Sequence, residues 1–351
     1  MNKMAIPLSL AMVTGMAHAQ SSVTLYGLAG GGLRWLNNTK GGSTLQYASV
    51  EAPNRFGLRG SEDLGNGVNA IFALENSFAT ANGTMTKSGV LFDQAAYVGL
   101  TGAYGKLTFG RQLTAGEDLG IELDPDHVAG ANVAITPSAL LGTNFFTLDT
   151  RFNNTVKYRG KFGGAAFAAS YSLGGVAGNT QAGASYSAMA TYQAGPLLAG
   201  AGYQRTYNAD ATQVAQSYQA GGFWQMGPVR LYMSYFALTV SGSSSNPAQR
   251  RDSIPQGGIV YQVTPALVLT AAVYDDIASN LGNKRGANGH KTTAYAIADY
   301  FLSKSTDVYI EFDRNSFTGA YRTDPTNLAL FNRNPASTAA TGVSVGFTTR
   351  F

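Results

Sequence analysis

The stretch Asn54-Arg55-Phe56-Gly57-Leu58-Arg59-Gly60-Ser61-Glu62 decides the fold that this sequence encodes. In an extended chain, successive side chains point to opposite faces, so Phe56 and Leu58 share one face while Arg55 and Arg59 share the other. One apolar and one polar face is typical of a soluble β-sandwich or of a membrane β-barrel. The same alternation returns in residues 68–78, 307–313 and 343–351.

The composition favours the membrane barrel, and the spacing of turns decides between the two classes. Of 351 residues, 43 are glycine and only 13% are charged, whereas a soluble domain usually carries about 25% charge. The only strongly apolar, helix-like stretch lies at the N-terminus, which argues against a helical membrane protein. A membrane barrel fits both facts, because its lipid-facing and water-facing residues alternate and average to neutral hydropathy.

The spacing of turns predicts the number of strands. Tight-turn signals recur about 32 to 40 residues apart, and longer polar segments rich in Gly, Asn and Ser lie between them. Short turns at one end and long loops at the other are the asymmetry of outer-membrane barrels. We therefore predict an all-β fold, a 16-stranded antiparallel transmembrane β-barrel with short periplasmic turns. The seven turn signals are Gly65-Asn66-Gly67, Gly102 to Gly105, Gly163-Gly164, Gly195-Pro196, Gly227-Pro228, Thr264-Pro265 and Lys304-Ser305.

The N-terminus reads as a secretory signal peptide. Lys3 supplies the positive start, residues 5–17 are apolar, and Ala17-His18-Ala19 is a small-x-small cleavage site. We expect residues 1–19 to be a signal peptide and residues 20–351 to form a single barrel domain.

One segment breaks the regular spacing. Residues 112–150 contain no Lys or Arg and carry six carboxylates. A loop this long in a regular sheet protein is usually functional or disordered. We predict that this long third loop folds into the lumen and narrows the pore. Its first five acids are the candidate constriction residues, with solvation or pairing to Arg111 as the alternative: Glu117, Asp118, Glu122, Asp124 and Asp126.

Several kinds of chemistry are excluded by what the chain lacks. Without cysteine there is no thiol catalysis, disulfide or thiolate metal site. The three histidines, His18, His127 and His290, are too far apart in sequence for ligand spacing, and a net charge of +4 is too mild to indicate nucleic acid. We expect no catalytic residue, cofactor or metal.

Several segments resemble the general diffusion porins of β-proteobacteria, a Gram-negative outer-membrane family. The resemblance spans the mature chain and implies a 16-stranded homotrimeric barrel with its third extracellular loop folded inside. It also implies contact with outer-membrane lipid and lipopolysaccharide, and delivery by the barrel-assembly machinery, for which the C-terminal Phe351 would be the signal. The matching segments include Ser22-Val23-Thr24-Leu25-Tyr26-Gly27, Arg55 to Gly65, Ala96-Tyr97-Val98-Gly99-Leu100, Gly110-Arg111-Gln112, Arg151-Phe152-Asn153-Asn154 and Arg350-Phe351.

A basic wall is expected opposite the acidic loop. Alternation points Arg55 and Arg59 inward on one strand and Arg151, Lys157 and Arg159 inward on another. In the resembling family, the positions of Arg55 and Arg151 belong to an arginine cluster at the constriction. Such a wall would create a transverse field in the pore. The alternative is that these side chains are simply solvated in a wide lumen.

The sequence departs from the family pattern at Gln94, which stands where the family usually has an inward arginine, with Asp93 beside it. With two cluster arginines facing up to five loop acids, simple counting predicts selectivity that is near neutral or slightly cation-favouring.

Three functions remain open. The first is a diffusion porin that passes ions and small hydrophilic solutes. The second is a substrate-selective channel, in which Phe145 and Phe146 could form an apolar track or merely anchor the loop. The third is an outer-membrane barrel enzyme, which needs a nucleophile beside a base, and no serine signature accompanies His127 or His290.

The expected trimer contact lies on the first strands and the last. Their outward residues are small or aromatic, and Gly99 is the position where an added charge should dissociate trimers. The residues assigned to this outward face are Leu25, Gly27, Phe72, Tyr97 and Phe347.

Overall fold

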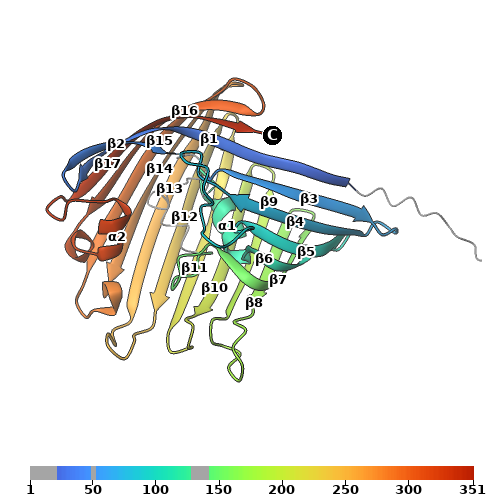
Figure 1. The fold of residues 1–351 in the computed structure, drawn as a ribbon, viewed down its shortest axis with the longest axis horizontal. Helices are drawn as coiled ribbons and strands as arrows, with labels where there is room; N and C mark the ends of the chain where they lie inside the picture. Colours follow the sequence, from blue (N-terminus) through green and yellow to red (C-terminus); the bar gives the residue numbers. More distant parts are fainter. Residues whose placement is uncertain (1–21, 49–52, 128–141) are drawn as a thin grey trace, which may run out of the picture.

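The computed structural model describes residues 22–48, 53–127 and 142–351. Its strands form one antiparallel sheet that closes on itself, because β1 (Ser22–Thr39) pairs with β17 (Ala339–Arg350) along one edge and with β2 (Gly42–Ala48) and β3 (Arg55–Asp63) along the other. Figure 1 shows the resulting barrel. The expected signal peptide, residues 1–19, lies outside the described residues.

The barrel has sixteen strand positions. β2 pairs with residues 32–39 of β1 and β3 with residues 22–28, so these two short strands lie end to end beside β1. Counting them as one position reduces the 17 strands of the sheet to 16, which confirms the predicted fold. Closure matters physically because an open sheet edge would leave backbone groups without partners in lipid.

The remaining strands follow in chain order, each paired with the next. No helix among the described residues is long and apolar enough to span a membrane. The strands are β4 (Asn69–Ser77), β5 (Ala95–Gly102), β6 (Gly105–Leu113), β7 (Arg151–Phe162), β8 (Ala165–Ser172), β9 (Ser185–Ala194), β10 (Leu197–Tyr207), β11 (Val214–Met226), β12 (Val229–Val240), β13 (Arg250–Thr264), β14 (Leu267–Ser279), β15 (Gly289–Phe301) and β16 (Thr306–Phe317).

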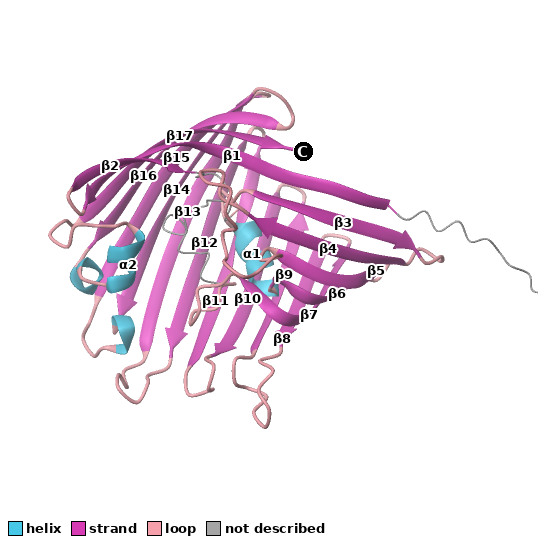
Figure 2. Cartoon of the chain, in the orientation of Figure 1, coloured by secondary structure: helices cyan, strands magenta, loops and turns pink. Residues whose placement is uncertain are grey.

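The seven predicted tight turns all join neighbouring strands at one end of the barrel. Several are two residues long, such as Gly195-Pro196 between β9 and β10, where Gly195 has a φ of 56° that favours glycine. The longer connections lie at the other end. Figure 2 shows the short helix α2 (Pro325–Leu330) at that loop end, and two 3₁₀ helices occupy Leu281–Asn283 and Gly319–Arg322.

The two faces of the wall differ as the alternation predicts. On β12, Met233 and Tyr235 are exposed outside, whereas Ser234 and Phe236 are buried inside. An apolar outer face is what a strand needs where it meets lipid.

One face assignment made from sequence is wrong. Val98 and Leu100 are the exposed, outward residues of β5, so the alternating Tyr97 and Gly99 point inward. Tyr97 confirms this orientation, since the Nζ of the inward Lys106 lies 4.8 Å from its ring centroid. A charge at Gly99 would therefore enter the lumen rather than a contact between subunits.

The barrel closes next to the C-terminus. Phe351 and Gly27 exchange two backbone hydrogen bonds of 2.9 and 3.0 Å, and the Phe351 side chain is exposed. Its proposed role as an assembly signal stays a prediction.

Candidate functional site

A short helix, α1 (Ala115–Leu123), follows β6 and lies against the inner face of β8 to β12 (Figure 1). It begins at Thr114, whose hydroxyl accepts a hydrogen bond from the backbone N–H of Glu117 at 3.3 Å, the usual way of satisfying a first-turn donor. The acidic first turn also complements the positive end of the helix dipole. The stretch with the most acids is therefore a helix inside the barrel, followed by residues 128–141, which the structure does not describe.

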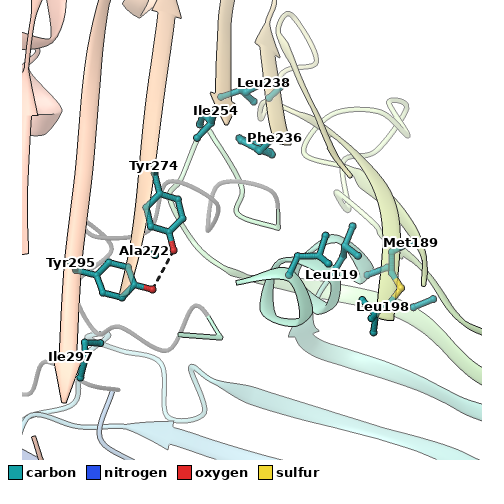
Figure 3. Close-up of a cluster of buried hydrophobic side chains, with 14 of the residues drawn as sticks. Leu119, Met189, Leu198, Phe236, Leu238, Ile254, Ala272, Tyr274, Tyr295 and Ile297 are labelled. Atoms are coloured by element: carbon teal, nitrogen blue, oxygen red, sulfur yellow. Dashed lines mark hydrogen bonds between the residues drawn. The ribbon is translucent and has the colours of Figure 1, made fainter. Parts of the chain in front are cut away.

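Leu119 holds α1 against the wall. It is fully buried and belongs to the apolar cluster shown in Figure 3, where it lies near Met189 and Leu198. A Cβ on Gly200 or Gly202 would come within 3.1 and 2.7 Å of the Leu119 methyl groups. Glycine at these two alternating positions of β10 therefore makes the close approach of the helix possible.

Asp124 fixes the C-terminal end of α1 to β14, two strands beyond the strands that the helix itself contacts. It has no exposed surface, and it accepts hydrogen bonds from the Tyr274 hydroxyl at 2.6 Å and the Asp126 backbone N–H at 3.0 Å. The Tyr274 ring stacks on Tyr295, and their hydroxyls are 3.3 Å apart (Figure 3). Asp124 is thus a bound anchor rather than a carboxylate that faces pore water.

Tyr274→Phe should loosen this anchor. Removing the hydroxyl leaves a buried carboxylate short of a donor, which costs about 1–3 kcal/mol. We expect noisier open-channel current in single-channel recordings, because α1 then samples undocked positions. Tyr295→Phe is the matched control, and equal noise in the two variants would contradict the anchoring role of Tyr274.

Asp118 is paired with the basic wall. The Lys157 Nζ donates to its Oδ1 at 2.7 Å, and the Arg159 Nη1 lies 3.3 Å from its Oδ2. Lys157 also donates to the backbone carbonyls of Leu113 and Thr114, at 3.1 and 3.4 Å. Two wall bases therefore neutralise one loop acid and hold the start of the helix to β7.

Glu117 lies close by in a different environment. Burial raises the pKa of its carboxyl to about 7, although the charges of Arg151 and Lys157 oppose that rise. Neither its Oε2 nor the Nε of Arg151 has a hydrogen-bond partner among the described residues. Glu117 is thus a buried carboxyl that feels the charge of Arg151 without forming an ion pair with it, and its pKa is raised to about 7.

The two remaining loop acids are more open. Burial also raises the pKa of Glu122, against the charges of Arg159 and Lys161. Asp126 is partly exposed and donates its backbone N–H to Asp124.

The far end of the loop is clamped at Asp149. Arg111 donates to both of its carboxylate oxygens, at 3.0 and 3.2 Å, and Lys87 pairs with the same carboxylate. Burial alone would raise the pKa of Asp149, but the hydrogen bonds from Lys87 and the Arg151 backbone N–H, with Arg111, hold it below its usual value. Arg111 therefore forms its ion pair with Asp149 and not with the acids of α1.

Arg55 and Arg59 lie on the inward face of β3, as predicted. Arg55 is about one third exposed, and its Nε is 3.9 Å from Glu75, a loose ion pair. The Arg59 guanidinium lies 5.1 Å from the ring centroid of Tyr26, and no ion pair of Arg59 is found among the described residues. These two cations face the lumen with little neutralisation.

The side-chain amide of Gln94 is hydrogen-bonded to the neighbouring carboxylate of Asp93. Its Nε2 donates to the Asp93 carboxylate at 2.8 Å, and the Ser77 backbone N–H donates to the same carboxylate at 2.6 Å. Asp93 is buried, so it adds no exposed negative charge beside Gln94.

Sequence reasoning missed three parts of this site. Lys106 points inward on β6 and could have been found by the same alternation. The glycine pair Gly200 and Gly202 carried a weaker signal, namely small residues at alternate positions of an inward face. Tyr274 carried none, because its partner Asp124 lies 150 positions away.

A closed antiparallel barrel with a helix docked on its inner wall is the architecture of a porin. The chain belongs to the Gram-negative porin family, whose model matches residues 8–320. This confirms the family resemblance found in the sequence.

Individual relatives agree with this assignment. An outer membrane porin of Bordetella pertussis is 34% identical over 182 residues, covering 47% of this chain and 46% of that protein. The major outer membrane protein P.IB of Neisseria meningitidis serogroup B is 28% identical over 231 residues, covering 62% and 64%. The matched part thus spans between about half and two thirds of these relatives. Among solved structures, the anion-selective porin from Comamonas acidovorans superposes with a TM-score of 0.76 at 21% identity, covering 94% of this chain and 100% of that one.

Proposed function

We propose that this protein forms a water-filled channel for passive diffusion of ions and small hydrophilic solutes, narrowed where α1 approaches the basic wall of β3, β6 and β7. The observation that carries the proposal is the docking of α1 inside the closed barrel, with Leu119 and Asp124 holding it in the lumen. Fixed charges around a narrow aqueous passage set its selectivity without any bond chemistry.

The pairing of the loop acids favours anions. Asp118 is neutralised by two wall bases, Asp124 is buried under Tyr274, and Glu117 is shielded and titrates near neutral pH. Arg55 and Arg59 remain open to the lumen. The proposed preference differs from the near-neutral or slightly cation-favouring balance obtained by counting charges, because counting treats every loop acid as free. The Comamonas acidovorans structure bears the description anion-selective, in line with this proposal.

Two other functions are less well supported. Phe145 and Phe146 form an edge-on pair that packs against the buried apolar cluster, and Arg250 lies over the Phe145 ring. That packing favours a loop anchor over an apolar track for one substrate class. For an enzyme, the His127 Nδ1 contacts the backbone carbonyl of Ile121 and the His290 Nδ1 contacts the Asp275 carboxylate, so neither is seen activating a nucleophile.

The assembly partners belong to the proposal as well. A homotrimer would bury the outward apolar residues of the first strands and the last, which the structure gives as Val23, Leu25, Val98, Leu100 and Phe347, all of them exposed in the single chain. Among related folds, OmpT of Vibrio cholerae is described in a trimer form. Outer-membrane lipid, lipopolysaccharide and the assembly machinery would meet the remaining outer surface and Phe351.

The anion preference should depend on pH through Glu117. Above a pKa of about 7 this carboxyl is ionised and offsets part of the charge of Arg151; below it the carboxyl is protonated, and Arg151 loses that compensation while Glu75 and Asp149 remain. Lowering the pH should therefore increase the permeability of Cl⁻ relative to K⁺, with a midpoint near 7. Glu117→Gln should remove that step and behave like wild type at low pH. A variant that keeps the full pH response would exclude Glu117 as its origin.

Planar-bilayer recording of the purified protein tests the proposed function. A diffusion channel gives discrete conductance steps that grow in proportion to salt concentration. Saturation of the current by one sugar, peptide or organic acid would instead support the substrate-selective alternative, and the absence of conductance would overturn the proposal.

A further inference from the structure

An arginine on the outer face of the barrel has no role in the pore. Gln204 and Thr206 of β10 are buried on the inner side, so the alternating Arg205 points outward. Arg205 lies at the loop end of β10. Its direct cross-strand neighbours are Tyr186 of β9 and Gln216 of β11. An outward charge on a lipid-facing wall is costly unless it reaches the interface or finds a partner.

Tyrosines surround this guanidinium. Its carbon lies 5.0 Å from the ring centroid of Tyr207, and Tyr203 lies two positions before it on the same outward face of β10. Tyr203 in turn donates to Gln216 at 3.0 Å. Within the part of the chain that the structure describes, Arg205 forms no ion pair, and its Nε is shielded from water without a hydrogen-bond partner. The side chain is thus held in place with its charge uncompensated.

The surface beneath Arg205 suits an acyl chain. The outward residues of β9 to β11 below the tyrosines are small and exposed, and larger aromatics return near the turn end at Tyr192 and Trp224. Two aromatic girdles separated by an apolar band mark a wall that faces lipid. The small residues of the band are Ala188, Ala190, Ala201 and Ala220.

We propose that Arg205, in the setting of Tyr186, Tyr203 and Tyr207, binds a phosphate group carried by a lipid of the outer leaflet, whose acyl chains lie along the alanine band. Arginine suits this ligand because its planar fork matches two phosphate oxygens at once. The site lies at headgroup level, next to an aromatic girdle, which favours a lipid-borne phosphate over a dissolved one.

Arg251 supplies a matched control. It also points outward at the loop end of the barrel, on β13, where its inward neighbour Asp252 is buried. Its guanidinium is already engaged, because the Nε and Nη2 donate to the Gln249 side chain at 3.1 and 3.0 Å. Arg251 therefore carries the same charge at a similar height on the barrel wall, but its guanidinium donors are already bonded to Gln249.

The test is native mass spectrometry of the detergent-purified protein titrated with diphosphoryl lipid A. Loss of one charge-assisted contact corresponds to about tenfold weaker binding, so Arg205→Gln should lose about that much while Arg251→Gln stays near wild type. Arg205→Lys keeps the positive charge but not the planar guanidinium, so it should lose part of the affinity for lipid A. It replaces the glutamine variant in the test if that variant fails to fold. Enzymatically dephosphorylated lipid A should not distinguish Arg205→Gln from wild type.

Three results would overturn the proposal: unchanged lipid A binding in Arg205→Gln, an equal loss in Arg251→Gln, or displacement of the lipid by inorganic phosphate at matched concentration, which would define a site for the free anion. Dissociation of oligomers by Arg205→Gln with lipid binding unchanged would equally overturn it, by assigning the residue to a subunit contact. Single-channel conductance should not change in these variants, so failure of this proposal is distinguishable from failure of the proposed channel.

Discussion

Replacing Arg55 and Arg59 together by glutamine is expected to abolish the anion preference of the channel and to favour cations. Both guanidinium groups face the lumen, and their removal takes away the ion pair of Glu75 with Arg55. A unit charge about 5 Å from a passing ion in water changes its energy by about 0.8 kcal/mol, or about fourfold in occupancy. Two such charges should change the occupancy of either ion by about fifteenfold, and the permeability ratio of Cl⁻ to K⁺ by at least that factor, because the two ions respond with opposite sign.

The zero-current potential across a KCl gradient measures this change, and the change should shrink as salt screens the charges. Arg230→Gln is the control, because Arg230 also points inward but lies next to the turn end of β12, over Phe223. If the double variant kept the wild-type potential, Arg55 and Arg59 would lie away from the narrow passage. An equal shift in Arg230→Gln would show that lumen charge acts without regard to its level.

Leu119→Asp should release α1 from the wall and enlarge the pore. Leu119 is fully buried against Gly200 and Gly202, and losing its contacts alone costs about 2–5 kcal/mol, to which an unpaired carboxylate adds. Because the barrel strands are untouched, the protein should still insert into the membrane. We expect single-channel conductance to rise about twofold, with increased noise, since the lumen widens where the loop leaves it.

Ile121→Asp is the matched control for this variant. Ile121 lies on the same helix but is only partly buried, so the substitution adds the same charge without emptying the contact with β10. A rise in conductance in Ile121→Asp alone, or an unchanged conductance in Leu119→Asp, would contradict the view that Leu119 holds the constricting helix in place.

The barrel itself was predictable because its signals are local. Alternation around Arg55 and Arg59 needs only the two-residue period of a strand, and turns such as Gly195-Pro196 need only backbone preferences. The error at Tyr97 has the same local origin. Residues 95–102 contain no charged side chain to mark the inner face, so an aromatic residue was assigned to the outside although it packs under Lys106.

The roles of the loop acids were not predictable, because they depend on which part of the wall the loop reaches. Asp118 and Asp124 are six positions apart in one acidic run, yet one pairs with Lys157 on β7 and the other bonds to Tyr274 on β14. Only the docking of α1, set by the shape of Gly200 and Gly202, separates them. This is why counting acids against arginines gives a different charge balance from the one that the folded chain presents.

The most direct test of the central claim, that the wall cations rather than the loop acids set the charge of the constriction, is the zero-current potential of the wild-type channel in a KCl gradient at low ionic strength. The structure predicts a potential whose sign reports preference for Cl⁻, and a larger preference on acidification as Glu117 is protonated. A potential that reports preference for K⁺ at neutral pH would contradict it.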